Sequence, residues 1–204
     1  MSTLVTDPEI QSRLRQERQA TGADRFDEVW EGVYVIAPLP NNEHQHLATR
    51  LATILDLILG LPGLGAVRAG INLADQAVDW RHDYRVPDVA VFLSSGRAEN
   101  RGAYWFGPAD FLIEITSPGD QTSEKLPFYS RLGVRELLII QRELWALELY
   151  RFQSTGLERV AVATEGGSTV LVCQQVPLRF GLVPGDSRPR IEVRHLESEQ
   201  RWLV

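Results

Sequence analysis

Two neighbouring apolar runs decide the fold: YRVPDVAVF (84–92) and DFLIEIT (110–116), followed by SPGDQTSEKLPFYSRLGVR (117–135). Short apolar runs bounded by turn residues are typical of buried strands. Each run holds one carboxylate, Asp88 at the start of the first and Glu114 inside the second. A carboxylate is costly to bury unless it is paired, hydrogen-bonded or bound to metal. Glu114 therefore indicates a site, the alternative being a glutamate that faces solvent on an edge strand.

Lys125 is the only lysine of the chain, since the other 20 of the 21 Lys and Arg residues are arginines. An ammonium is a compact point charge whose pKa shifts when it is buried, whereas a guanidinium is planar and always charged. A lysine retained just after the E-x-T-S-P segment favours a functional role. The alternative is a compositional bias towards arginine with one random survivor.

The residues after Glu114 predict a β-α-β unit. Ser117-Pro118-Gly119 breaks the strand, a helix starts near Ser123 and runs to Gly133, and a buried strand follows at 136–141. Such a unit is expected to be parallel and right-handed. Pro127 is expected in or near the first helical turn, which places Lys125 at the helix entrance. Lys125 and Tyr129 share a helix face at i, i+4, as Gln121 does if the turn extends back.

The N-terminal part predicts a surface helix from Asp7-Pro8 to Gly22 and a hairpin of strands 26–30 and 33–37 joined through Glu31-Gly32. A long buried helix then covers 43–59. Its first turn contains Glu43, which would add a third carboxylate if this end faces the strands, and His44, which is either a polar first-turn residue or part of the site rim. Further expected strands are 66–73, 145–152, a hairpin of 159–164 with 169–173, and 190–194.

Composition limits the class of protein. A chain of 204 residues fits one domain with additions, and its apolar content of 44% supports a real core. One cysteine rules out an internal disulfide and, with no apolar signal core, predicts a cytoplasmic location. No apolar run reaches the ~20 residues that span a bilayer, so no membrane partner is expected.

The net charge of −6 argues against a broad basic nucleic-acid surface but leaves room for a local cleft near the site. Seven arginines lie near the site in sequence: Arg81, Arg85, Arg97, Arg101, Arg131, Arg135 and Arg142.

The sequence contains no P-loop, GxGxxG, GxSxG or Cys/His zinc spacing. Oxygen-ligand chemistry remains, and two carboxylates with room for water suit Mg²⁺ or Mn²⁺. Such an ion polarises a phosphoryl oxygen and lowers the pKa of a bound water, and a nearby lysine stabilises developing negative charge.

These motifs carry a resemblance. Pro87-Asp88 followed by I-E-I-T (113–116) resembles the PD-(D/E)xK nuclease superfamily. The ordered set PDVAVF, DFLIEITSPGD, EKLPFYSRLGVRELLII and ELYRF is similar to the Uma family of bacterial candidate endonucleases, as is EGVYVIAPLPNNEHQHLATRL. The resemblance covers about residues 27–152.

The resemblance implies an α/β (α+β) restriction-endonuclease-like fold, with a mixed sheet flanked by helices. It makes 1–204 a single domain with its core at about 27–152, an N-terminal helix and hairpin, and a C-terminal β extension at about 153–204. It implies that Asp88, Glu114 and the Ile115 carbonyl bind the metal, and that the protein is a homodimer acting on DNA. The usual lysine position is Thr116, so Lys125 takes that role from the helix, and Gln121 stands where many relatives have Asp.

Two functions follow from the sequence. The retained Asp88–Glu114–Lys125 set favours a Mg²⁺-dependent endonuclease that hydrolyses DNA. The acidic balance and the Thr116 and Gln121 departures favour a non-catalytic DNA-binding or protein-assembly module on a degraded nuclease fold.

Overall fold

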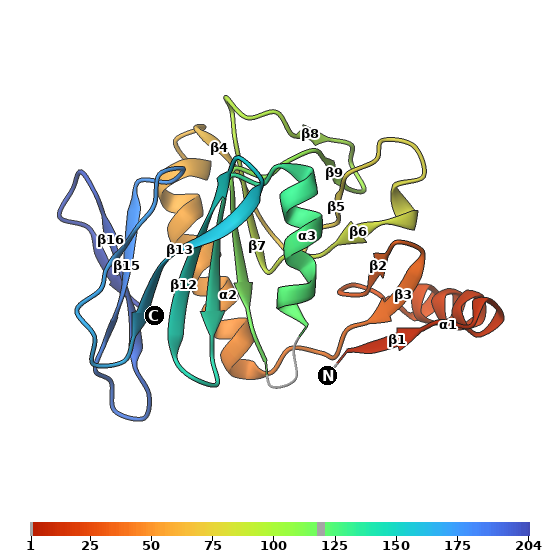
Figure 1. Ribbon diagram of the computed structural model, residues 1–204, viewed down its shortest axis with the longest axis horizontal. Helices are drawn as coiled ribbons and strands as arrows, with labels where there is room; N and C mark the ends of the chain where they lie inside the picture. The colour runs from red at the N-terminus through yellow and green to blue at the C-terminus, as the bar shows by residue number, and fades with distance from the viewer. Residues whose placement is uncertain (1, 118–120) are drawn as a thin grey trace.

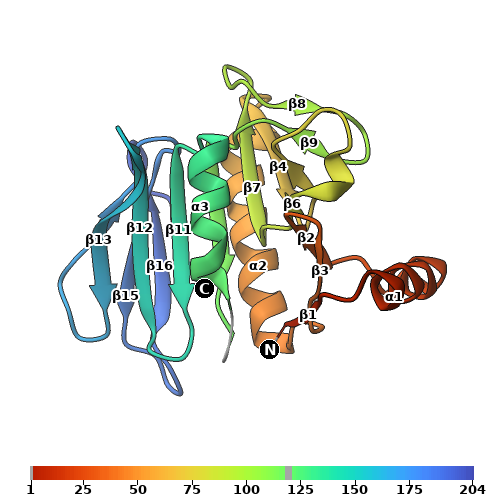
Figure 2. The ribbon, with the colours of Figure 1, turned by 45° about the vertical axis from the view of Figure 1, so that its right-hand side comes forward.

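The computed structural model describes residues 2–117 and 121–204 (Figure 1). It is an α+β protein whose described strands form three sheets. The helices are α1 (Pro8–Thr21), α2 (Asn42–Leu55), continued by a π-helical turn (Asp56–Gly60), and α3 (Thr122–Leu132), with one 3₁₀ turn at Trp80–His82. The C-terminal strands and the N-terminal hairpin with α1 lie at opposite ends of the molecule in Figure 1, and Figure 2 shows the N-terminal hairpin beside β7 (Val89–Leu93) and α2.

The central sheet has the strand order β13-β12-β11-β10-β7-β4. Strands β10 and β11 are parallel and joined by α3, which confirms the predicted β-α-β unit, and the other neighbours are antiparallel. Gly133 ends α3 in the left-handed conformation, as predicted. The strands are β4 (Gly65–Ala69), β7 (Val89–Leu93), β10 (Phe111–Ile115), β11 (Glu136–Gln141), β12 (Ala146–Gln153) and β13 (Gly156–Thr164).

Successive side chains of β10 point alternately into two hydrophobic layers, one on each face of the central sheet. Phe111, Ile113 and Ile115 belong to the cluster that contains α2, whereas Leu112 belongs to the cluster that contains α3. Because successive side chains of a strand point to opposite faces, Glu114 lies on the α3 face. The sequence thus places the carboxylate of β10 under the helix that carries Lys125.

The N-terminal sheet brings the hairpin over the end of the central sheet. Glu31 and Gly32 form its two-residue turn with positive φ (49° and 88°), the geometry that matches strand twist. The hairpin and the N-terminal helix were both predicted, and Asp7 caps α1 as expected. The sheet has the order β1-β3-β2-β6-β5-β9-β8, made of β1 (Thr3–Val5), β2 (Glu28–Trp30), β3 (Val33–Ile36), β5 (Leu73–Ala74), β6 (Tyr84–Arg85), β8 (Glu99–Asn100) and β9 (Trp105–Phe106).

The C-terminal sheet packs on the α2 face of the central sheet. Phe180 stacks on Phe111 of β10 with ring centroids 6.3 Å apart, and both belong to the hydrophobic cluster that includes α2. No helix of the described residues is long and apolar enough to cross a membrane. The strands are β14 (Leu171–Val172), β15 (Leu178–Val183), β16 (Arg190–His195) and β17 (Arg201–Leu203).

Three local predictions need correction. The expected strand 66–73 is two strands in different sheets, because the chain turns at Gly70 (φ 58°). The expected hairpin of 159–164 with 169–173 is wrong, since β13 pairs with β12 and β14 pairs with β15. Pro127 lies at the sixth residue of α3, deeper than the first turn. The predicted break at 117–119 falls largely outside the described residues.

Candidate functional site

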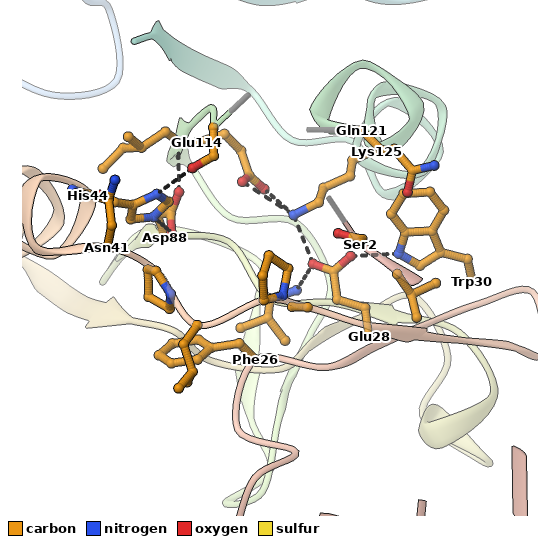
Figure 3. A pocket seen from close by; sticks show the side chains of 18 residues that line it. Ser2, Phe26, Glu28, Trp30, Asn41, His44, Asp88, Glu114, Gln121 and Lys125 are labelled. Atoms are coloured by element: carbon orange, nitrogen blue, oxygen red, sulfur yellow. Dashed lines mark hydrogen bonds and ion pairs between the residues drawn. The ribbon is translucent and has the colours of Figure 1, made fainter. Parts of the chain in front are cut away.

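A cavity of about 310 Å³ lies where the hairpin meets the central sheet. Its charged wall comes from β2, the first turn of α2, the residue before β7, β10 and α3 (Figure 3). The opposite wall is mostly apolar and comes from the hairpin and the segment after it, and includes Phe26, Val35, Pro38, Leu39 and Pro40.

Asp88 and Glu114 both line this cavity. The antiparallel register pairs Ile113 with Val89, and continuing it by one residue sets Glu114 opposite Asp88. Directly opposed side chains of an antiparallel pair lie on the same face. The two carboxylates that the sequence singled out are therefore brought together at the point where β7 begins.

Asp88 is held by two donors. Its Oδ1 lies 2.7 Å from His44 Nε2, and its Oδ2 accepts from the backbone N–H of Ile115 at 2.7 Å. An ionised carboxylate only accepts, so Nε2 of His44 carries the proton and Nδ1 faces Ser117 Oγ at 3.5 Å. His44, left open as a rim residue by the sequence, orients the first carboxylate.

Glu114 is buried, with a side chain 3% exposed. Lys125 Nζ donates to both of its oxygens at 3.3 Å, and the Tyr129 hydroxyl donates to Oε1. Burial raises the pKa of Glu114 to about 8; Lys125 opposes this shift, and the charges of Asp88 and Glu28 add to it. A carboxylate this poorly solvated gains from any further cation in the cavity.

Lys125 lies in the first turn of α3, with its ammonium between two carboxylates. Its Nζ is 2.9 Å from Glu28 Oε1, closer than to either oxygen of Glu114. Burial alone would lower the pKa of Lys125, but Glu114 and Glu28 outweigh it and the pKa is raised. Lys125 therefore stays charged at the cavity, on the same helix face as Tyr129, as predicted.

Glu28 is the functional residue that the sequence analysis missed. It is 4% exposed in β2, and it lines the cavity with the other two carboxylates. A signal was present, because Glu28 is a charged residue within an apolar strand, like Glu114. The signal was easy to overlook, because Asp27 precedes Glu28 and two adjacent acidic residues resemble the polar end of a strand. Asp27 itself is bound by Arg18 and Tyr34 and does not line the cavity.

The remaining candidates have mixed positions. Ile115 and Gln121 line the cavity, and Gln121 Oε1 has no hydrogen-bond partner among the described residues. Glu43 does not supply a third carboxylate: it pairs with Arg142 at 2.6 Å and Arg188 at 2.7 Å and is not part of the cavity wall. Thr116, at the usual lysine position, bonds to β11 residues instead.

The arginines near the site in sequence do not build a basic cleft. Four of the seven neutralise carboxylates away from the cavity, namely Arg101 with Glu99, Arg131 with Asp75 and Asp83, Arg135 with Asp110, and Arg142 with Glu43. Arg85 is buried against Asp83. Among the described residues, the cavity wall contains three carboxylates and one ammonium.

The donor chemistry fits a hard divalent cation. Asp88, Glu114 and the Ile115 carbonyl are oxygen donors of the kind that Mg²⁺ takes, with water and a substrate phosphate completing its shell. No group of three or more His, Cys, Asp or Glu among the described residues is arranged as a complete metal site. Two carboxylates with open positions suit an ion that retains waters, rather than a closed structural site.

A mixed sheet flanked by helices, with carboxylates on neighbouring strands and a lysine in the first turn of the helix that follows, is the arrangement of restriction-endonuclease-like proteins. The chain belongs to the Uma2 family, whose model is described as "Putative restriction endonuclease" and matches residues 14–184. The resemblance to the Uma family that the sequence predicts is thereby confirmed.

A solved structure supports the fold. The chain is similar to a protein from Anabaena variabilis ATCC 29413, described as a putative nuclease belonging to DUF820, with 20% identity and a TM-score of 0.56. The match covers 79% of this chain and 82% of that one. No curated protein matches the chain significantly.

Proposed function

We propose that this protein hydrolyses phosphodiester bonds of DNA as a Mg²⁺- or Mn²⁺-dependent endonuclease. One observation carries the proposal: Asp88 and Glu114 line one cavity, and the only lysine of the chain donates to both oxygens of Glu114. Membership of a family whose model is described as "Putative restriction endonuclease" agrees with this chemistry.

Each side chain has a defined task in this proposal. Asp88, oriented by His44 and the Ile115 N–H, and Glu114, oriented by Tyr129, hold the cation together with the Ile115 carbonyl. A bound divalent ion supplies a polarised phosphoryl oxygen and a more acidic water. Lys125 donates to a phosphoryl oxygen and stabilises the charge that develops there. The apolar hairpin wall limits the access of bulk water to these groups.

The charge of the cavity explains why the cation is required. Among the described residues of the cavity wall, the carboxylates of Glu28, Asp88 and Glu114 exceed the single ammonium of Lys125 by two negative charges when Glu114 is ionised, and by one when it is protonated. A phosphodiester adds a further negative charge, so like charges would oppose its entry. We therefore expect metal binding to precede or accompany DNA binding.

Cleavage of supercoiled and linear DNA, with and without Mg²⁺ or Mn²⁺, tests the function. Asp88→Asn and Glu114→Gln are expected to lose activity by at least ~10²-fold, the scale lost when one transition-state contact is removed. Glu143→Gln is the control, because it neutralises an exposed glutamate outside the cavity wall. Equal activity in all variants would contradict the proposal.

The binding or assembly module remains the second candidate, on a specific observation. Both carboxylates have protein partners, and most of the arginines near the site in sequence are paired with other carboxylates. Thermal unfolding with increasing Mg²⁺ separates the two candidates, since a ligand stabilises the folded state by RT ln(1 + [L]/Kd). Stabilisation abolished by Glu114→Gln supports the nuclease; no stabilisation in the parent protein favours the module.

The proposal includes a homodimer located in the cytoplasm, with residues 1–204 as a single domain. Light scattering coupled to size exclusion measures the oligomeric state directly. A monomeric protein that cleaves DNA would remove the dimer from the proposal and leave the chemistry intact.

A further inference from the structure

We propose that Glu28 is a positioning residue: it holds the Lys125 ammonium at the cavity when Glu114 turns to a bound cation. This inference rests on the proposed function and deepens it. The geometry behind it is the short pair between Glu28 Oε1 and Lys125 Nζ, at 2.9 Å.

Glu28 is fixed by groups that have no part in the chemistry. Its Oε1 accepts from the backbone N–H of Val86 at 2.8 Å, and its Oε2 accepts from Trp30 Nε1 at 2.6 Å. Its side chain is 5% exposed. Both oxygens are therefore anchored to the hairpin and to the segment that leads to Asp88, and the carboxylate has little freedom to leave Lys125.

Glu114 cannot hold Lys125 alone in a loaded site. The charged groups facing Lys125 are Glu28 on β2, Glu114 on β10 and Asp88 before β7, with Tyr129 of its own helix bound to Glu114. A divalent cation bound by a carboxylate offsets the attraction of that carboxylate for an ammonium, and the cation itself repels the ammonium. Glu28, in contrast, is held in place by Val86 and Trp30, which are not metal ligands, so it keeps its position beside Lys125.

The division of contacts also leaves a donor for substrate. An ammonium has three N–H bonds. Glu28 accepts from one of them, and the two oxygens of Glu114 accept from the others. Any N–H that Glu114 releases on binding a cation is available to a phosphoryl oxygen.

The unique lysine makes a direct test available. Labelling the full-length protein with ¹⁵N-lysine gives one side-chain ammonium signal, which is visible only when hydrogen bonds slow its exchange with water. With Mg²⁺ alone as the probe, at fixed pH, we expect the wild-type signal to shift and persist. In Glu28→Gln the signal is expected to disappear on adding Mg²⁺.

Two variants control this measurement. Glu124→Gln removes a carboxylate one residue from Lys125, but Glu124 is exposed, and we expect its spectrum to match the wild type. Glu28→Asp keeps the charge with a shorter reach and is expected to retain part of the signal. If Glu28→Gln does not fold because Trp30 or Val86 loses its acceptor, Glu28→Asp decides the question: a signal weakened by Mg²⁺ supports the positioning role, and a signal as strong as in the wild type overturns it.

Hydrolysis kinetics separate this inference from the function beneath it. We expect Glu28→Gln to lower kcat by ~10-fold or more with little change in KM, and to add nothing in a Lys125→Met background, because residues that act through one another are not additive. A Lys125 signal that persists with Mg²⁺ in Glu28→Gln overturns the positioning role while leaving the nuclease intact. No Mg²⁺ response in the wild type overturns the proposed function, and this inference with it.

Discussion

Among the described residues of the site, Glu114 has the surroundings least favourable to a negative charge, because it is buried, central in the sheet and close to two other carboxylates. Burial, opposed by Lys125, raises the pKa of Glu114 in the folded protein to about 8 from an ordinary value of 4.5. Because the pKa of Glu114 is higher in the folded protein than in the unfolded one, the folded state binds more protons between the two pKa values. The stability this provides is fully present below the unfolded pKa and is lost as the pH rises through the folded pKa. Glu114 thus weakens the metal-free protein between pH 5 and 8.

We expect Glu114→Gln to remove this pH dependence. The variant should gain stability relative to the parent as pH rises from 5 to 8, by a few kcal/mol at most, since one pKa unit corresponds to about 1.4 kcal/mol. Urea unfolding at several pH values, without metal, measures the difference. A difference that is constant across this range would show that Glu114 is ionised throughout in the folded protein.

Lys125→Arg tests whether the site needs a point charge. The ammonium lies 2.9 Å from Glu28 and 3.3 Å from Glu114 in a space with 13% side-chain exposure, and a longer planar guanidinium does not fit that space. We expect a ~10²–10³-fold loss of turnover. Lys125→Met should also destabilise the fold, on the order of 3 kcal/mol, because it leaves two buried carboxylates without their cation. Comparing kcat with the free energy of unfolding in both variants distinguishes the two effects.

At this scale the sequence predicted the residues with the clearest chemical mismatch. Glu114 and Lys125 stood out because one charge interrupts an apolar run and the other is unique in the chain. Glu28 did not stand out, because its partner Lys125 lies 97 positions away in the chain, as the sequence numbering shows. A contact of that separation depends on how the hairpin docks, which no local pattern encodes.

At the scale of elements, the start of α2 links helix capping to the site. Asn41 Oδ1 accepts from the His44 N–H at 3.0 Å, and the His44 ring holds Asp88. We expect Asn41→Ala to lower the free energy of unfolding by about 1 kcal/mol and to weaken Mg²⁺ binding, because the cap fixes the first helical turn. Asn41→Ser, which retains a capping oxygen, is the control. Thermal shift with and without Mg²⁺ measures both effects, and unchanged metal affinity in Asn41→Ala would uncouple the cap from Asp88.

Elements with local signals were predictable, and those decided by partner choice were not. The unit β10-α3-β11 follows from two apolar runs around a helix with a C-terminal glycine, and the first hairpin follows from Glu31-Gly32. The segments 159–164 and 169–173 carry an equally good hairpin signal around Gly166-Gly167. They separate because β13 finds a longer partner in β12, whereas Leu171 enters the core shared with the C-terminal sheet.

At the scale of the whole molecule, the C-terminal sheet and the central sheet share one hydrophobic cluster. Phe180 of β15 is fully buried and stacks on Phe111 of β10, the strand that carries Glu114. Arg188, between β15 and β16, reaches Glu43 at 2.7 Å and lies over the Trp145 ring at 4.5 Å. These contacts predict that the C-terminal extension and the nuclease-like core unfold as one cooperative unit.

Phe180→Ala tests this prediction. Truncating a buried phenylalanine is expected to lower the free energy of unfolding by about 3–5 kcal/mol, through lost burial and the cavity left behind. If the sheets unfold together, calorimetry should show one transition in the parent and one transition at lower temperature in the variant. Phe152→Ala is the matched control, because Phe152 of β12 is 43% exposed, and it should shift the transition little. A second transition in Phe180→Ala at the parent temperature would show that residues 153–204 and the core are separate folding units, and would contradict the single-domain prediction.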